Sequence, residues 1–199
     1  MNHLRVVLLY VTFINQFVKV STLYNKWLIF MKKLLAACLI SLGLVGCATT
    51  SGTAPKVSTS GFDGSKRVSI DGHGVACDQM VCPLIGAIWS SNTPNLVGLK
   101  ISVINSIVAI NSVDLNVDGE IIKLRENTIT DFSNDIVLES SKVFVTDLST
   151  VDKILKSKRA WIRVNTSKGL IENPIIDGSK DSKAYHALKR FKDQVNTVK

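Results

Sequence analysis

The sequence predicts an α+β domain: a mainly antiparallel β-sheet with one short helix and a C-terminal amphipathic helix packed on it. Three observations predict this fold. Alternating apolar residues mark several strands, turn sequences join strands into two hairpins, and two segments show helical spacing. The length of 199 residues and the hydrophobic fraction of 46% suit a single globular domain, which we place at residues 62–197.

The strand pattern is clearest at residues 113–124, which predict a β-hairpin. Asp118 and Gly119 form a dipeptide preferred in two-residue turns, where both central residues adopt positive φ angles. With this turn the apolar pairs Leu115–Ile122 and Val113–Leu124 share one face, and Asp114 lies opposite Lys123 on the other as a pair of opposite charge.

Two further strands are expected at residues 100–105 and 142–147. In the first, Ile101 and Val103 fall on one face. In the second, Val143 and Val145 share one face and Phe144 lies on the other, because successive side chains of a strand point to opposite sides.

A second hairpin is expected to begin at residues 159–165. Residues 166–169 suit a four-residue loop that ends in a glycine at positive φ. This register places Arg163 opposite Glu172, and Pro174 is expected to end the pairing because proline lacks the amide hydrogen.

Helical spacing appears in two places. A short helix is expected after residue 148, with Ser149 and Asp152 at its start. A longer helix is expected over residues 182–195, with Asp181 as its cap. Apolar residues recur on one side of it: Ala184, Leu188, Phe191 and Val195.

The N-terminal region contains a complete export signal. Residues 31–47 begin with a methionine and two lysines, continue in a short apolar run, and end in Leu44-Val45-Gly46-Cys47. This tetrapeptide resembles the lipobox of bacterial lipoproteins, in which small residues precede a cysteine. We therefore expect residues 31–46 to be a lipoprotein signal peptide.

The lipobox resemblance implies that Cys47 becomes the new N-terminus and carries covalent lipid. Several acyl chains give a stable membrane anchor. By the same resemblance, Ala48 after the cysteine favours the periplasmic face of the outer membrane over the inner membrane. Residues 47–61 are small and polar, and they are expected to form the lipidated cysteine and a flexible linker.

Residues 1–30 precede a methionine that already starts a full signal peptide. The favoured interpretation is that translation begins at Met31 and that residues 1–30 are a misassigned extension. The alternative is a genuine additional apolar helix.

The net charge of +8 does not indicate a nucleic-acid partner. Five of the basic residues precede residue 47, where no acidic residue occurs: Arg5, Lys19, Lys26, Lys32 and Lys33. Removing these five reduces the charge from +8 to +3, which is close to balanced, so nucleic acid is excluded as a partner.

Two cysteines remain beyond the lipobox, Cys77 and Cys82, and a disulfide between them is expected because exported proteins fold in an oxidising compartment. The alternative is a metal site with His73 as a third ligand, but no fourth ligand is evident. No metal or other cofactor is expected. A redox dithiol is disfavoured because the spacing is not C-x-x-C.

The sequence Asp71-Gly72-His73-Gly74 has the residue types of a general base held by an acid. No nucleophile is forced into line with His73, so a glycine turn that leads into the disulfide loop is the favoured interpretation. The alternative is a periplasmic hydrolase that uses His73.

Trp161 lies between Arg159 and Arg163 on one face of its predicted strand. These three residues could contact a ligand, either an anionic glycan or a partner protein, by stacking and charge. The favoured interpretation is instead that the C-terminal helix covers this face and buries Trp161 in the core.

The favoured function is that of a non-enzymatic binding or structural accessory of the cell envelope. The alternative is a hydrolase or metal-binding protein that uses His73 with Cys77 and Cys82, and a subunit of an envelope complex is a third possibility. Beyond the lipobox, the chain resembles small envelope lipoproteins of Gram-negative bacteria in its leader, its linker, its cysteine pair before Pro83 and its basic C-terminal helix. This looser resemblance implies no activity and no site residues.

Overall fold

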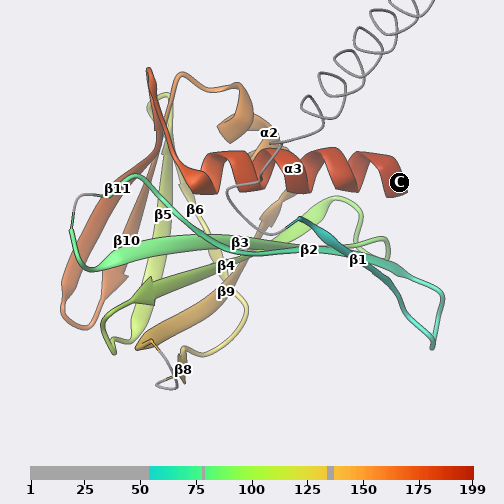
Figure 1. Cartoon of the computed structure of the whole chain (residues 1–199), viewed down its shortest axis with the longest axis horizontal. Coiled ribbons are helices and arrows are strands. Elements are labelled where there is room, and N and C mark those ends of the chain that lie inside the picture. The colour runs from blue at the N-terminus through green and yellow to red at the C-terminus, as the bar shows by residue number, and fades with distance from the viewer. Residues whose placement is uncertain (1–53, 78, 134–136) are drawn as a thin grey trace, which may run out of the picture. The chain divides into compact units, whose positions relative to one another are not determined.

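The computed structural model describes residues 54–77, 79–133 and 137–199, which form two antiparallel sheets and two helices (Figure 1). This arrangement confirms a mainly antiparallel α+β fold. The predictions for residues 1–30, for the signal peptide and for Cys47 lie outside the described residues. Among the helices that are described, neither is long and apolar enough to cross a membrane.

The larger sheet has seven strands in the order β1-β2-β3-β4-β9-β7, and β8 also pairs with β9.

The strand that the sequence predicts at residues 142–147 lies within β9 (Glu139–Asp147) of this sheet. Phe144 is fully buried on the inner face, while Val143 and Val145 are half-buried on the other. The strands are β1 (Lys56–Thr59), β2 (Lys66–Gly74), β3 (Cys82–Ser90), β4 (Leu96–Ile104), β7 (Arg125–Glu126), β8 (Asp131–Ser133) and β9 (Glu139–Asp147).

The smaller sheet has five strands in the order β12-β11-β10-β5-β6. In Figure 1 its long strands run across the direction of β2, β3 and β4, so the inner faces of the two sheets enclose a common core. The strands are β5 (Ile110–Val117), β6 (Glu120–Lys123), β10 (Arg159–Thr166), β11 (Gly169–Asp177) and β12 (Lys180–Asp181).

The hairpin of β5 and β6 has the predicted turn and register. Asp118 and Gly119 have φ angles of 50° and 96°, as a two-residue turn of this type requires. Asp114 lies opposite Lys123. The local turn chemistry therefore determines which residues of this hairpin face the core.

The hairpin of β10 and β11 has the predicted register, with Arg163 opposite Glu172, but it differs in two details. Thr166 pairs with Gly169, so the loop contains two residues rather than four. The expectation that Pro174 ends the pairing is wrong, since β11 continues to Asp177. A β-bulge interrupts the register beside Pro174, and bulges accommodate proline within a strand.

Helix α2 (Leu148–Lys156) begins before the predicted start at Ser149. Asp147 occupies the N-cap position, and its side chain makes no capping hydrogen bond. The amide of Leu148 instead donates to the carbonyl oxygen of Asn95 at 2.8 Å. A backbone contact from the β3–β4 connection thus replaces the side-chain cap that the sequence predicts.

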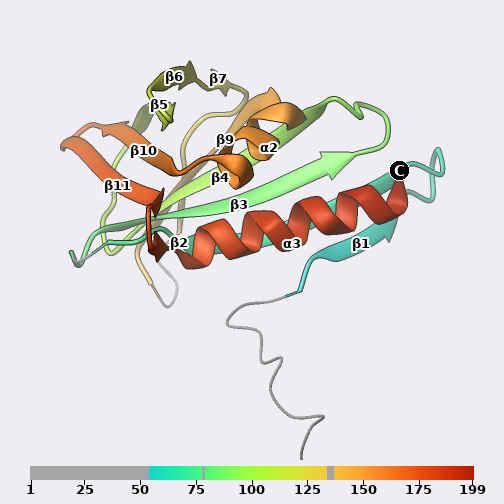
Figure 2. The ribbon, with the colours of Figure 1, turned by 90° about the horizontal axis from the view of Figure 1, so that it is seen from above.

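Ser182 is the N-cap of helix α3 (Lys183–Val198), and its hydroxyl accepts a hydrogen bond from the Tyr185 amide at 3.1 Å. The predicted cap, Asp181, is therefore wrong by one residue. Its carboxylate instead lies 2.8 Å from Nε2 of His186. Helix α3 packs against β2 and β3 (Figure 2), and its residues Ala184, Leu188, Phe191 and Val195 are fully buried.

The predicted linker 47–61 is wrong in its last part. Residues Lys56–Thr59 form β1, which pairs with Lys66 to Ser69 of β2. All four residues of β1 are exposed, so this edge strand is stabilised by backbone pairing with little apolar burial. That explains why no apolar alternation marks it in the sequence.

Candidate functional site

Cys77 and Cys82 form a disulfide that closes the connection from β2 to β3. Their Cα atoms are 6.1 Å apart, within the usual range for a bridged pair. The prediction of a disulfide is confirmed. Because both sulfur atoms are engaged with each other, neither offers a thiolate to a metal ion in this state.

Replacing Cys77 and Cys82 together with alanine should lower the free energy of unfolding by about 2 kcal/mol, the loop-closure value for so short a loop. Equilibrium urea denaturation of oxidised protein and of the double variant measures this difference. A thiol titration of the native protein should find no reactive group at these two positions. Two reactive thiols, or stoichiometric zinc that is lost in His73→Ala, would contradict the structural bridge.

His73 lies inside β2 and is buried on the core side of the strand, opposite Ile85. Its Nδ1 atom is 2.7 Å from the carbonyl oxygen of Asp71. The Asp71 carboxylate turns away to the surface, where it binds Lys56 at 2.9 Å. The acid and the imidazole of the predicted hydrolase are therefore not brought together, and the described residues contain no cluster of three or more metal-ligating side chains.

The predicted glycine turn at residues 71–74 is wrong, because β2 continues through it with a β-bulge between Ile70 and His73. The glycines here allow close contact between strands. A Cβ atom on Gly86 of β3 would lie 2.9 Å from the Ile70 carbonyl oxygen. A Cβ atom on Gly72 would lie 3.2 Å from Cβ of Leu84. The glycines thus serve packing at the bulge.

The face that carries Trp161 is open. The expectation that the C-terminal helix covers Trp161 is wrong, since α3 packs on β2 and β3 of the larger sheet. Trp161 is half-buried, whereas Arg159 and Arg163 on the same face are exposed. The core side of β10 is filled by the alternate residues Ala160, Ile162 and Val164, so the tryptophan belongs to the outer face.

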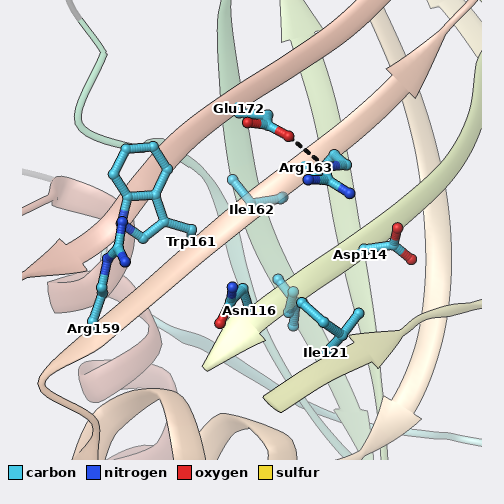
Figure 3. A pocket seen from close by; sticks show the side chains of 9 residues that line it. Asp114, Asn116, Ile121, Arg159, Trp161, Ile162, Arg163 and Glu172 are labelled. Carbon is cyan, nitrogen blue, oxygen red and sulfur yellow. Dashed lines mark hydrogen bonds and ion pairs between the residues drawn. The ribbon is translucent and has the colours of Figure 1, made fainter. Parts of the chain in front are cut away.

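A pocket of about 180 Å³ lies on this outer face, which we call the Trp161 face (Figure 3). The pocket is formed by strands β5, β6, β10 and β11. Buried Leu115 and Ile162 contribute to its lining from below. The remaining lining residues are Asp114, Asn116, Ile121, Arg159, Trp161, Arg163 and Glu172.

The indole of Trp161 is held in position by two neighbours. Its Nε1 atom donates a hydrogen bond to Oδ2 of Asp177 at 3.1 Å. The guanidinium carbon of Arg159 lies 5.1 Å from the ring centroid, within cation–π range. Arg159 in turn lies 3.6 Å from Oδ1 of Asp177. These two neighbours therefore fix the orientation of the ring.

The charges of the pocket are balanced. Arg163 forms an ion pair with Glu172, its cross-strand neighbour. Asp114 lies across from Arg163 on β5, and Arg159 is the second cation of the lining. Two cations and two carboxylates thus line the pocket, which does not select strongly for a ligand of either charge.

Comparison of the chain with protein-family models, with curated proteins and with solved structures finds no match. The assignment of a site therefore depends on the geometry of the described residues.

Sequence reasoning identified Arg159, Trp161 and Arg163 but missed Asn116 and Ile121. Both come from strands that approach β10 only in the folded sheet. Ile121 is 54% exposed and lies next to Ile122 in an edge strand. Successive side chains of a strand point to opposite faces, so two consecutive isoleucines require one to face outward. This pattern in the sequence indicates an isoleucine on the outer face.

Proposed function

We propose that this chain is a lipid-anchored, non-enzymatic accessory of the cell envelope, located on the periplasmic face of the outer membrane. In this proposal it binds another envelope protein through the Trp161 face. The observation that carries the proposal is a positioned, half-buried tryptophan in a pocket on a sheet face that α3 leaves open.

A protein partner fits this pocket better than a small molecule or an anionic glycan. Small-molecule sites usually enclose about 300–1,000 Å³, whereas a pocket of about 180 Å³ suits one side chain of a partner. Tryptophan and arginine are the residues most enriched at the energetic centres of protein interfaces. Arg163 pairs with Glu172 and Arg159 lies 3.6 Å from Asp177, so both cations that line the pocket already have acidic neighbours, which disfavours an anionic glycan.

The environment of the cysteines and His73 supports binding rather than catalysis. Cys77 and Cys82 are joined in a disulfide, and the Nδ1 atom of His73 faces a backbone carbonyl. The membrane anchor is proposed from the lipobox at residues 44–47.

The C-terminal helix has a structural role in this proposal. We infer that α3 is an amphipathic helix and a permanent cover for the inner face of the larger sheet. Its buried residues include Leu188 and Phe191, and its Lys192 binds Asp152 of α2 at 2.7 Å. With α3 engaged in this way, its apolar residues are not available to a partner, whereas the Trp161 face is open.

Trp161→Ala should weaken partner binding by about 30-fold, which corresponds to about 2 kcal/mol for a hot-spot residue. The experiment is crosslinking in intact cells, followed by recovery of the tagged chain and titration with the recovered partner. Leu170→Ala is the matched control. Leu170 is 62% exposed on the same face, opposite Asn165, but it does not line the pocket.

The outcome is interpretable only if both variants are folded, so their thermal unfolding is compared with that of the unsubstituted protein. Unchanged partner binding by folded Trp161→Ala would contradict the proposed binding face. Recovery of a glycan that requires Trp161 would retain the site but contradict the class of partner.

A further inference from the structure

The turn between β1 and β2 displays an aromatic side chain to solvent. Phe62 is 99% exposed, the most exposed large hydrophobic residue of the described chain. In Figure 1 the β1–β2 hairpin extends past the C-terminal end of α3, so this turn projects from the body of the domain. An aromatic ring in this position buries no apolar surface within the domain, so it is free to contact an apolar environment outside it.

The turn that carries Phe62 is fixed by its own hydrogen bonds. The amide of Ser60 donates to the Ser65 carbonyl at 2.8 Å, and the amide of Gly64 donates to the Ser60 carbonyl at 3.0 Å. The amide of Phe62 donates to the Ser60 hydroxyl at 3.2 Å. Gly64 has a φ of 72°, which glycine adopts without strain. Phe62 is therefore presented on a defined backbone.

Asp63 links this turn to the neighbouring β3–β4 connection. Its carboxylate accepts hydrogen bonds from the Ser65 amide at 3.0 Å and from Nδ2 of Asn92 at 2.8 Å. These bonds, that from the Ser65 backbone foremost, hold the pKa of Asp63 well below its usual range. The carboxylate thus remains ionised and bound within the protein at neutral pH, and the turn stays attached to the sheet.

Two basic residues follow the exposed ring. Lys66 and Arg67 come directly after the turn and are exposed, whereas Lys56, at the far end of β1, pairs with Asp71. Asp63 is the one acidic residue in the sequence from Lys56 to Arg67. An aromatic tip with an excess of positive charge complements an anionic lipid surface, where aromatic rings settle at the level of the headgroups.

We propose that Phe62 inserts into the interfacial region of the membrane to which the chain is tethered, with Lys66 and Arg67 against anionic headgroups. This inference rests on the proposed lipid at Cys47. The chain from Cys47 to the start of β1 at Lys56 can reach at most about 30 Å, and β1 adds only about 13 Å more. The turn is therefore held within reach of the bilayer surface.

The test uses full-length mature lipoprotein reconstituted into vesicles that contain anionic phosphatidylglycerol and phosphatidylethanolamine. In the Phe62→Trp variant, the added emission should shift to shorter wavelength and be quenched by lipids with brominated acyl chains. Vesicles of phosphatidylcholine alone should reduce this quenching, because the basic residues then lack anionic partners. The emission of the unsubstituted protein is subtracted as background.

Met80→Trp is the matched control. Met80 is 83% exposed and lies in the disulfide loop, at the opposite end of β2 from the turn. Its added emission should be unaffected by brominated lipid. Mass spectrometry of the same sample reports the lipid on Cys47. A chain without lipid overturns the proposed anchor, whereas a lipidated chain whose Phe62→Trp emission is not quenched overturns this inference alone.

Discussion

Lys142→Ala should lower the free energy of unfolding by about 2–4 kcal/mol, because it removes a buried side chain that joins the two sheets. Lys142 lies on the inner face of β9, and its side chain is only 8% exposed. Its Nζ atom donates to the carbonyl oxygen of Ile110 in β5 at 3.0 Å and to Glu126 at 2.9 Å. The ammonium also lies 5.4 Å from the ring centroid of Phe144.

Two further variants separate packing from hydrogen bonding at this position. Lys142→Met retains most of the buried stem but leaves the Ile110 carbonyl without the ammonium donor, so a loss of about 1–3 kcal/mol is expected. Glu126→Gln should cost less than about 1 kcal/mol, since the Glu126 side chain is more than half exposed. Urea denaturation measures the free energy of unfolding of all three variants. An unchanged free energy of unfolding in Lys142→Ala would contradict the role of this side chain in joining the sheets.

Cys47→Ser should abolish lipid attachment completely. The lipobox resemblance places the lipid on the cysteine sulfur, and a serine hydroxyl lacks the nucleophilicity of a thiolate. Each acyl methylene contributes about 0.8 kcal/mol to membrane affinity, so the loss of whole chains removes stable anchoring. Metabolic labelling with palmitate and membrane fractionation measure the effect, and the uncut precursor should accumulate.

Cys38→Ser is the control for this experiment, because Cys38 lies within the predicted signal peptide. This variant should be labelled and cut as efficiently as the unsubstituted protein. Lipid labelling that persists in Cys47→Ser, or a mature N-terminus at another residue, would contradict the lipoprotein assignment.

The sequence predicts local pairing well, because turn chemistry acts between neighbouring residues. Asp118-Gly119 determines the register of its hairpin, and the turn after β10 correctly predicts that Arg163 lies opposite Glu172. Strand β1 was missed because its residues are exposed and polar, and its pairing with β2 depends on backbone bonds that leave no apolar pattern.

The candidate site was only partly predictable for a different reason. Alternation in β10 shows that Arg159, Trp161 and Arg163 share a face, but it does not show which face of which sheet a distant helix will cover. That choice depends on where α3 packs, and α3 follows two further strands along the chain. Asn116 joins the pocket through the pairing of β10 with β5, which brings together segments far apart in sequence.

The order of the strands has a consequence for how the domain can be divided. The larger sheet is completed by the pairing of β4 with β9, yet β5 and β6 of the smaller sheet lie between them in sequence. The smaller sheet is completed in turn by β10, which follows β9. The two sheets are therefore interleaved along the chain, and no single cut yields two fragments that each contain a whole sheet. Such interleaving makes folding cooperative and relatively slow, because distant segments must meet before either sheet gains its central pairing.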